Sequence, residues 1–326
     1  MSGTPIAPHG REIGLFAILG VFLSLVFGVG ALPGVLGLYV LWLAYITTMA
    51  RLSFRAPSKR KPPIEDAFWE AVDVSTRLGE VRFYRSPTRP NADTAILVHG
   101  WSAGARRMTG RAKAFTDAGL NTILVDLPSH GASASLRFWS AEGSVSMLIE
   151  GLNRLNQQSA DHFGKRLFYF GHSMGGFVGL RLSKRRSELD LDGDWSGWVM
   201  ESPMTGYSEI FDETCRLLRL PQLFRWSLET RVLRKFRALN PHSDVRCLRD
   251  ADMPVWGTLT EPTLLLQAAN DERLGNTHHE RLVGEMKRST SVPFEAHMLE
   301  SLTHSGAHDH VERHALVASW LTAQTS

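Results

Sequence analysis

The sequence predicts an α/β protein with a mostly parallel sheet, preceded by an apolar N-terminal segment. From residue 62 onward, short apolar runs alternate with longer amphipathic runs, as expected for strands that alternate with helices. Several short runs are continuously apolar, which indicates strands covered on both faces. The chain has 326 residues, of which 43% are hydrophobic and 21% are charged, so it can bury a full core.

The N-terminal segment Ile13–Ala50 contains 38 residues and no formal charge. One straight helix of this length would extend about 57 Å, well beyond a bilayer hydrocarbon core of about 30 Å. Pro33, within Gly28–Gly34, removes a backbone donor and predicts a break. We expect a transmembrane hairpin of two short helices, with one kinked span or a re-entrant hairpin as alternatives. A buried hairpin of a soluble protein and a cleaved signal peptide fit less well.

A basic cluster follows the apolar segment and predicts its orientation. Such clusters stay on the cytoplasmic side of a membrane, so we expect the rest of the chain to face the cytoplasm. The cluster consists of Arg51, Arg55, Lys59, Arg60 and Lys61. Residues 1–61 are the expected membrane anchor and basic linker, and residues 62–326 the expected α/β domain. The net charge outside the anchor is slightly negative, so no nucleic-acid partner is expected.

The α/β domain is expected to alternate strands and helices. Strands are expected at residues 81–86, 94–100, 121–127, 166–173, 197–202, 262–269 and 294–300. Helices are expected at residues 106–118, 141–163, 177–188 and 310–321. Residues 203–255 exceed a simple crossover between two strands, and we expect them to form a helical lid. Cys215 and Cys247 are too few for a disulfide framework.

The motif Gly171-His172-Ser173-Met174-Gly175 lies where a predicted strand gives way to a predicted helix. The pattern G-x-S-x-G in this context indicates a nucleophile elbow, a sharp turn that exposes a reactive serine above the sheet. Residues without a β-carbon are needed beside such a turn, and the helix N-terminus favours developing negative charge nearby. Ser173 is therefore the predicted nucleophile. The alternative is a glycine-containing turn with an incidental serine.

A serine nucleophile needs a base that is oriented by a carboxylate, and in this architecture both follow the serine in the order acid, then histidine. Asp271 follows an apolar strand and is the predicted acid, with Glu272 and Glu201 as competitors. The predicted base is His304, in the loop before the last helix, and His308 is its rival.

An oxyanion hole is also required, and the backbone N–H groups of Met174 and Trp101 are its predicted donors. Trp101 could also wall the acyl site. His130 and His172 are interpreted as packing and hydrogen-bonding groups. His310 and His314 have a spacing that could bind a metal, but no further metal-ligand pattern accompanies them, so no metal is expected.

Taken together, these motifs resemble the α/β-hydrolase superfamily, especially its serine esterases, monoacylglycerol lipases and lysophospholipase-like members. The resemblance covers about residues 71–322 and is carried by HGW (99–101), DLPSHGAS (126–133), GHSMGG (171–176), AAND (268–271) and a late His304. It implies the α/β-hydrolase fold, a catalytic triad of Ser173, Asp271 and His304, and no cofactor. Ser129 stands where the family often has glycine, and the N-terminal hairpin is an addition to the common form.

The resulting hypothesis is a membrane-anchored serine hydrolase that cleaves carboxylic esters through an acyl-serine intermediate. Its expected location favours a lipid substrate, such as a monoacylglycerol or lysophospholipid. Thioesterase, acyltransferase and peptidase activities on the same triad stay open. So do a noncatalytic membrane-bound binding protein with this fold and a metal-dependent hydrolase that uses the late histidines.

Overall fold

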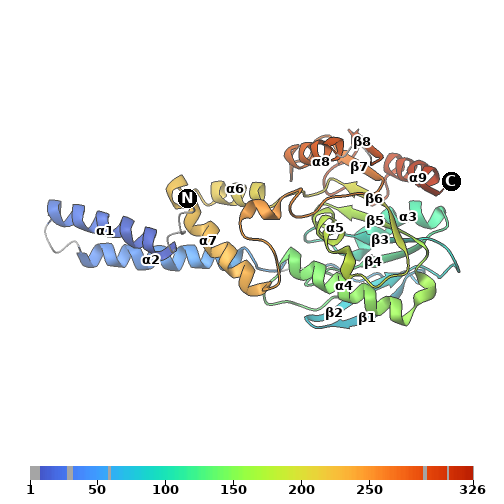
Figure 1. Cartoon of the computed structure of the whole chain (residues 1–326), viewed down its shortest axis with the longest axis horizontal. Coiled ribbons are helices and arrows are strands. Elements are labelled where there is room, and N and C mark those ends of the chain that lie inside the picture. The colour runs from blue at the N-terminus through green and yellow to red at the C-terminus, as the bar shows by residue number, and fades with distance from the viewer. Residues whose placement is uncertain (1–7, 28–31, 58–59, 289–291, 307, 326) are drawn as a thin grey trace. The chain divides into compact units, whose positions relative to one another are not determined.

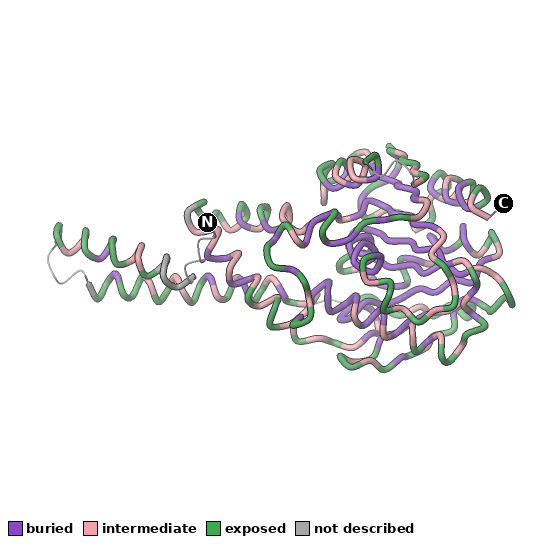
Figure 2. Tube along the Cα trace, viewed as in Figure 1, coloured by how far each residue is buried: buried purple, intermediate pink, exposed green. Residues whose placement is uncertain are grey.

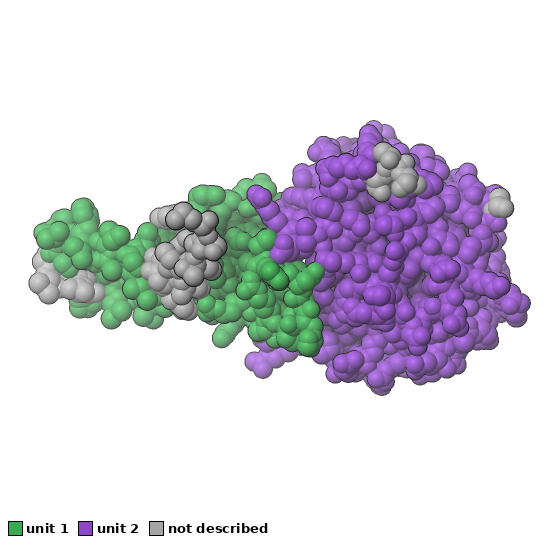
Figure 3. All heavy atoms as spheres, viewed as in Figure 1, with its two compact units in different colours: residues 1–55, 210–248 green, residues 56–209, 249–326 purple. Residues whose placement is uncertain are grey.

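The computed structural model describes residues 8–27, 32–57, 60–288, 292–306 and 308–325. The chain divides into two compact units (Figure 3). Unit 1 contains residues 1–55 and 210–248, and unit 2 contains residues 56–209 and 249–326. Much of the expected lid segment, residues 203–255, therefore groups with the N-terminal helices and not with the sheet.

Unit 2 is built on one sheet with the strand order β1-β2-β4-β3-β5-β6-β7-β8 (Figure 1). β1 pairs antiparallel with β2 and β2 pairs antiparallel with β4, whereas all other neighbours are parallel. The strands are β1 (Glu70–Thr76), β2 (Gly79–Arg85), β3 (Thr94–Val98), β4 (Asn121–Val125), β5 (Arg166–His172), β6 (Asp194–Glu201), β7 (Thr263–Ala268) and β8 (Phe294–Leu299). The mostly parallel sheet predicted from the sequence is confirmed.

Two pairs of helices cover the sheet. α3 (Thr109–Asp117) contacts α9 (Val311–Thr325), and α4 (Ala141–Gln158) contacts α5 (Met174–Lys184). Alternate residues of β5 face the two pairs: Phe168 packs on Trp320 of α9, whereas the hydroxyl of Tyr169 donates to the Gly175 carbonyl of α5. This alternation explains why the central strands are apolar throughout. An additional helix, α8 (Thr277–Arg288), contacts β8.

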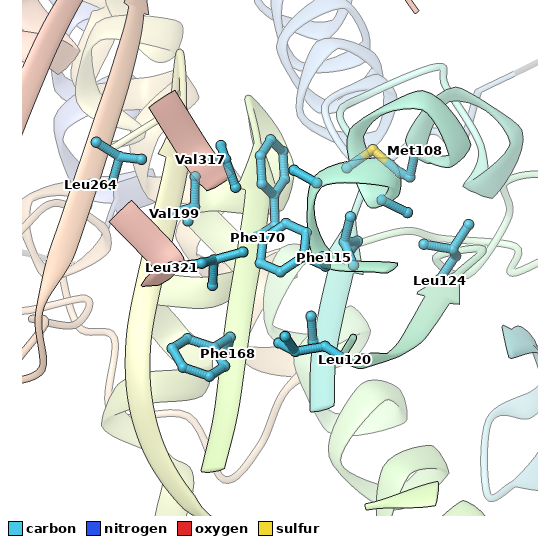
Figure 4. Close-up of a cluster of buried hydrophobic side chains, with 14 of the residues drawn as sticks. Met108, Phe115, Leu120, Leu124, Phe168, Phe170, Val199, Leu264, Val317 and Leu321 are labelled. Atoms are coloured by element: carbon cyan, nitrogen blue, oxygen red, sulfur yellow. The ribbon is translucent and has the colours of Figure 1, made fainter. Parts of the chain in front are cut away.

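A large apolar cluster lies between the sheet and the α3/α9 pair (Figure 4). Phe115 of α3 meets Phe170 of β5 edge to face, with ring centroids 6.2 Å apart. The sticks in Figure 4 also place Leu124, Val199 and Leu321 in this cluster. Figure 2 shows the central strands buried along their length. The sheet is thus a rigid platform whose carboxyl edge carries the loops described below.

Unit 1 consists of helices. They are α1 (Pro8–Phe27), α2 (Leu32–Leu52), α7 (Gln222–Leu239) and most of α6 (Ser208–Leu217). α1 packs on α2, with the rings of Phe16 and Tyr39 4.9 Å apart, and α7 packs against both. Residues 28–31 of the predicted break lie outside the described residues. Pro33 falls in the first turn of α2, where a missing N–H removes no helical hydrogen bond.

One helix in the described part of the chain is long and apolar enough to cross a membrane. It is Pro33–Leu52, with a mean hydropathy of 1.5, and Ile13–Val26 is a shorter apolar stretch. Buried core helices and signal sequences meet the same criterion, so length and composition by themselves identify only a candidate anchor.

Candidate active site

Ser173 lies on a sharp turn between β5 and α5, with φ 53° and ψ −116°. A positive φ is costly for a residue with a β-carbon and persists only where the surroundings enforce it. Added β-carbons would overlap neighbouring atoms: at Gly171, 2.7 Å from the Gly176 nitrogen, and at Gly175, 2.1 Å from the Val98 oxygen. The glycines around Ser173 are therefore needed for close backbone approach, as the sequence predicts.

The structure brings Ser173, His304 and Asp271 together in one hydrogen-bonded chain. The His304 Nε2 atom lies 2.9 Å from Ser173 Oγ, and His304 Nδ1 lies 2.8 Å from Asp271 Oδ2. All three residues are buried. Because an ionised carboxylate can only accept, the Nδ1–H donates to Asp271, and Nε2 is left to accept the hydroxyl proton of Ser173.

The Asp271 carboxylate is held by several donors. Oδ1 accepts from the backbone N–H groups of Arg273 (3.0 Å) and Leu274 (2.9 Å), and Oδ2 also accepts from Gln267 Nε2 (3.1 Å). Burial raises the pKa of Asp271, but the hydrogen bonds from His304 and these N–H groups outweigh it, so the pKa lies below its usual value. The carboxylate stays ionised and points at the imidazole.

The competing acids lie elsewhere. Glu272 is exposed, although it directly follows Asp271. Glu201 is fully buried at the end of β6, where its carboxylate pairs with Arg111 and lies 3.5 Å from Arg313 Nη1. Burial raises the pKa of Glu201, but the two guanidinium groups with His172 outweigh it and lower the pKa to about 2. Glu201 is an ionised structural carboxylate and not a partner of His304.

The rival base His308 is also placed away from the serine. Its Nε2 atom lies 2.7 Å from the Thr109 hydroxyl at the start of α3, and its Nδ1 atom lies 3.2 Å from Asp309. A β-carbon at Gly110 would lie 2.1 Å from the His308 carbonyl oxygen, so the backbone here rests directly on α3. The segment between β8 and α9, which we call the histidine loop, is thereby held so that His304 and not His308 reaches Ser173.

The two predicted oxyanion donors are the N–H groups of Trp101, in the loop that follows β3, and of Met174, at the start of α5. Gly100 lies against Ser173, since a β-carbon there would be 3.0 Å from that of Ser173. Within the described residues, neither the Trp101 N–H nor the Met174 N–H donates a hydrogen bond to the protein. Met174 is also the first residue of α5, where the helix dipole is positive.

Two buried neutral histidines connect these loops. His172 Nε2–H donates to the His304 carbonyl (2.7 Å), and burial with the nearby Arg111 lowers the pKa of His172 to about 4. His99 Nδ1–H donates to the Gly100 carbonyl (2.7 Å), while its Nε2 accepts from the Leu127 N–H (3.0 Å). Burial lowers the pKa of His99 to about 4 as well. His172 has the hydrogen-bonding role predicted for it.

An aromatic group borders the oxyanion loop. The Trp101 ring meets His130 and Trp139 edge to face, at 5.2 Å and 4.7 Å between centroids, and Trp101 keeps 44% of its surface exposed. His130 Nδ1–H donates to the Pro128 carbonyl (2.9 Å), and burial, with His99 nearby, lowers the pKa of His130 to about 3. His130 therefore packs as a neutral ring, as predicted.

Three side chains that support this site are absent from the sequence-based prediction. Gln267 hydrogen-bonds Asp271, and Arg111 and Arg313 hold Glu201 and the histidine loop. A polar residue inside the apolar strand 262–269 is a signal that points to Gln267. The arginines carry no local signal, because each lies on an amphipathic helix where a solvated charge is the ordinary expectation.

The late histidines take separate partners. His310 Nε2 lies 3.1 Å from the Ser301 hydroxyl, and His314 Nε2 lies 3.6 Å from Asp117 Oδ2. In the part of the chain that the structure describes, no three His, Cys, Asp or Glu side chains gather as metal ligands would.

The family model described as serine aminopeptidase S33 matches residues 89–255. An esterase from Pyrococcus furiosus has a similar structure, with 15% sequence identity, a TM-score of 0.56, and coverage of 84% of this chain and 98% of the esterase. Mouse alpha/beta hydrolase domain-containing protein 10 has 14% identity and a TM-score of 0.52, covering 79% of this chain and all of that chain. At these identities the likeness shows the fold alone. No curated protein matches the sequence.

Proposed function

Because the chain belongs to the serine aminopeptidase S33 family of α/β hydrolases, we propose that it is a serine hydrolase that cleaves carboxylic esters. The observation that carries the proposal is the hydrogen-bonded chain from Ser173 through His304 to Asp271, with distances of 2.9 and 2.8 Å. The strained elbow presents the serine hydroxyl to this base.

In the first half-reaction, Ser173 Oγ attacks the ester carbonyl carbon while His304 Nε2 takes the hydroxyl proton. The imidazolium that forms is stabilised by the ionised Asp271. The carbonyl oxygen becomes an oxyanion, which accepts hydrogen bonds from the N–H groups of Trp101 and Met174. His304 then gives its proton to the leaving alkoxide, and the acyl group stays on Ser173.

In the second half-reaction, water takes the place of the alcohol. His304 Nε2 accepts a proton from the water as its oxygen attacks the acyl carbonyl, and the same two N–H groups bind the second oxyanion. The proton returns to Ser173 Oγ when the acyl-oxygen bond breaks, which releases a carboxylic acid. The two half-reactions include no redox step and use no cofactor.

We further propose that the enzyme is anchored to a membrane by α1 and α2 and acts on lipid-like esters, such as a monoacylglycerol or a lysophospholipid. The support is the apolar surface of these helices, which includes Leu25 at 81% exposure and Leu41 at 67%. Exposed apolar patches of this extent mark membrane or protein contacts. The cytoplasmic orientation and the lid role of residues 203–255 stay predictions.

The description of the matched family favours peptidase activity as a second candidate, because it names an aminopeptidase. The same triad would cleave an amide with His304 as the acid that protonates the departing amine. The two candidates differ only in the leaving group, so substrates decide between them.

The test is hydrolysis of three substrate sets by the full-length protein: p-nitrophenyl esters of increasing chain length, monoacylglycerols with lysophospholipids, and aminoacyl p-nitroanilides. We expect ester turnover that is abolished in Ser173→Ala, together with labelling of Ser173 by a fluorophosphonate probe. Nitroanilide turnover without ester turnover would select the peptidase. Full turnover by Ser173→Ala, or no labelling while a control hydrolase reacts, would reject the serine mechanism in favour of a metal-dependent or a noncatalytic protein.

A further inference from the structure

We propose that α1 and α2 form a monotopic anchor, a helical hairpin that enters the acyl chains of one bilayer leaflet and does not cross to the other side. The inference rests on the membrane anchoring proposed above and concerns the depth of insertion. It replaces the transmembrane hairpin expected from the sequence with a re-entrant one.

The two helices pair in a defined antiparallel register. Phe16 meets Tyr39, with ring centroids 4.9 Å apart, and a β-carbon on Gly20 would lie 3.6 Å from Val35 Cγ1. Each residue of α1 is therefore level with a residue of α2, and Ile13 falls near the level of Trp42. The position of any residue along the hairpin can be compared between the two helices.

Exposed apolar side chains are concentrated toward one end of this hairpin. The exposed large apolar side chains are Ile13, Ile18, Leu19, Val21, Phe22, Leu25 and Val26 of α1 and Leu36, Leu38, Val40, Leu41, Tyr45 and Leu52 of α2. Beyond Leu41 buried and exposed apolar side chains are mixed, because Ile46 is 0% and Ala50 3% exposed, whereas Tyr45 is 37% and Leu52 47% exposed. Most of the exposed apolar surface thus runs from the level of Ile13 and Trp42 to the end where the two helices are joined.

The rest of α2 is accompanied by a helix that does not belong in hydrocarbon. α7 packs against α2, and its Phe224 ring lies 4.4 Å from the Trp42 ring. The next residue, Arg225, forms an ion pair with Asp212 at 3.1 Å, and one turn further Glu229 follows on the same helix. A bilayer whose hydrocarbon core began at Leu52 would enclose these charges. Charged side chains are energetically costly in the hydrocarbon core, so this position of the bilayer is disfavoured.

The length of the exposed apolar surface fits one leaflet. At about 1.5 Å per residue, Ile13–Val26 is about 21 Å long, whereas a span of the hydrocarbon core needs about 30 Å. One leaflet with its headgroup region measures about 20 to 22 Å, half of a bilayer of about 40 to 45 Å. Trp42 and Tyr45 lie where the apolar surface ends, and such aromatic rings favour the headgroup level.

The two arrangements reverse the depth order of two exposed positions. In the monotopic anchor, Leu25 lies near the bilayer centre and Leu41 near the headgroups. In a hairpin that spans the bilayer through Pro33–Leu52, Leu41 lies near the centre and Leu25 near the far headgroups. Which of Leu25 and Leu41 lies deeper therefore distinguishes the monotopic anchor from the transmembrane hairpin.

The experiment uses full-length protein in phosphatidylcholine vesicles, with Cys247→Ser removing the exposed thiol and the buried Cys215 kept. Leu25→Cys and Leu41→Cys are each labelled with a fluorophore and quenched by lipids brominated either deep or shallow in the acyl chain. Val311 lies in unit 2 and is 87% exposed. The variant Val311→Cys is therefore the control, because it carries the label on an exposed site outside the hairpin.

We expect the deep quencher to act several-fold more strongly at Leu25 than at Leu41, and the shallow quencher to act in the opposite order. If the deep quencher acts more strongly at Leu41 and the shallow quencher more strongly at Leu25, the monotopic anchor is overturned, but the protein is still anchored to the membrane. Quenching at Leu25 and Leu41 no stronger than at Val311 would instead remove the membrane anchor itself, and with it the lipid-substrate part of the proposed function. Ester hydrolysis by the same samples reports independently on the serine mechanism.

Discussion

Replacing Glu201 with glutamine tests whether the buried charge cluster under the histidine loop positions the base. Glu201 is fully buried and accepts from Arg111 Nε at 3.1 and 3.0 Å, while Arg313 Nη1 lies 3.5 Å from its Oε2. Arg313 also donates to the His308 carbonyl (2.8 Å), and His172, 3.8 Å from Glu201, donates to the His304 carbonyl. Glu201→Gln keeps the shape but removes the negative charge that faces the two guanidinium groups.

The expected loss of stability follows from the pKa of Glu201. Folding lowers this pKa from 4.5 to about 2. Such a lowering corresponds to about 3 kcal/mol of folding free energy at neutral pH. Because the folded pKa is lowered, this stability is present above pH 4.5 and is lost as the pH falls toward 2. Breaking a buried ion pair by mutation costs a comparable amount, about 3 to 5 kcal/mol.

A matched control exists on the other pair of helices. Glu142 of α4 is also buried between two arginines, 2.7 Å from Arg181 Nε and 2.9 Å from Arg185 Nη1, and these ion pairs do not involve the histidine loop. Urea unfolding should show that Glu201→Gln and Glu142→Gln both lower the free energy of unfolding by about 3 kcal/mol at pH 7.

Ester hydrolysis should separate the two variants. We expect kcat to fall about tenfold or more in Glu201→Gln, since the loop of His304 loses its support and the two uncompensated cations disfavour the imidazolium, a change of roughly 1.4 kcal/mol in the barrier. Glu142→Gln should keep the wild-type kcat. Equal kcat values in the two variants would refute the positioning role. A stability loss below about 1 kcal/mol in Glu201→Gln would show that the ion pairs of Glu201 do not stabilise the folded protein.

Three further changes probe the site and its frame. Asp271→Asn should lower kcat by about 10⁴-fold, measured on the preferred ester, because an amide favours the wrong imidazole tautomer. Acidification from pH 6.5 to 4 should lower the urea concentration at the unfolding midpoint. The reason is that His99 and His172, with pKa values of about 4, stay neutral in the folded protein and take up protons when it unfolds. An unchanged midpoint would contradict the burial of these two rings. Gly175→Ala should leave little soluble protein, because the β-carbon would lie 2.1 Å from a carbonyl oxygen, whereas Gly284→Ala, with only an arginine tip 3.8 Å away, should be tolerated or stabilised by about 1 kcal/mol in thermal unfolding.

The sharp turn that carries Ser173 could be predicted because its signal is local. Gly171, Ser173 and Gly175 lie within five residues. The predicted need for residues without a β-carbon is confirmed, because β-carbons at Gly171 and Gly175 would overlap backbone atoms. The fold could be predicted for a similar reason, since continuous apolar strands report their own burial. β1 is absent from the predicted strands because it is an exposed edge strand in which Val74 is the most buried side chain, so its sequence alternates without a strong apolar run.

The choice between His304 and His308 is a different kind of problem. Both occur in one loop after the last strand, four residues apart, and both precede a helix. What separates them is the contact of the loop with α3, where Thr109 and Gly110 receive His308. That contact joins positions about 200 residues apart in the chain, so no local pattern encodes it. The packing of α2 has the same character, because α7 covers it from a distant part of the sequence.

The buried histidines beside the nucleophile set a condition on the pH range of the enzyme. His99 and His172 each donate one N–H to a carbonyl of a loop that forms the site, Gly100 in one case and His304 in the other. An extra proton on His172 would sit on Nδ1, because Nε2 already donates to the His304 carbonyl. The protonated ring would therefore be a buried cation near Arg111, and the loops would separate to hydrate it. Acid should thus inactivate the enzyme by opening the frame of the site, and the fluorophosphonate reaction of Ser173 should be lost together with the folded-state fluorescence signal as the pH falls toward 4.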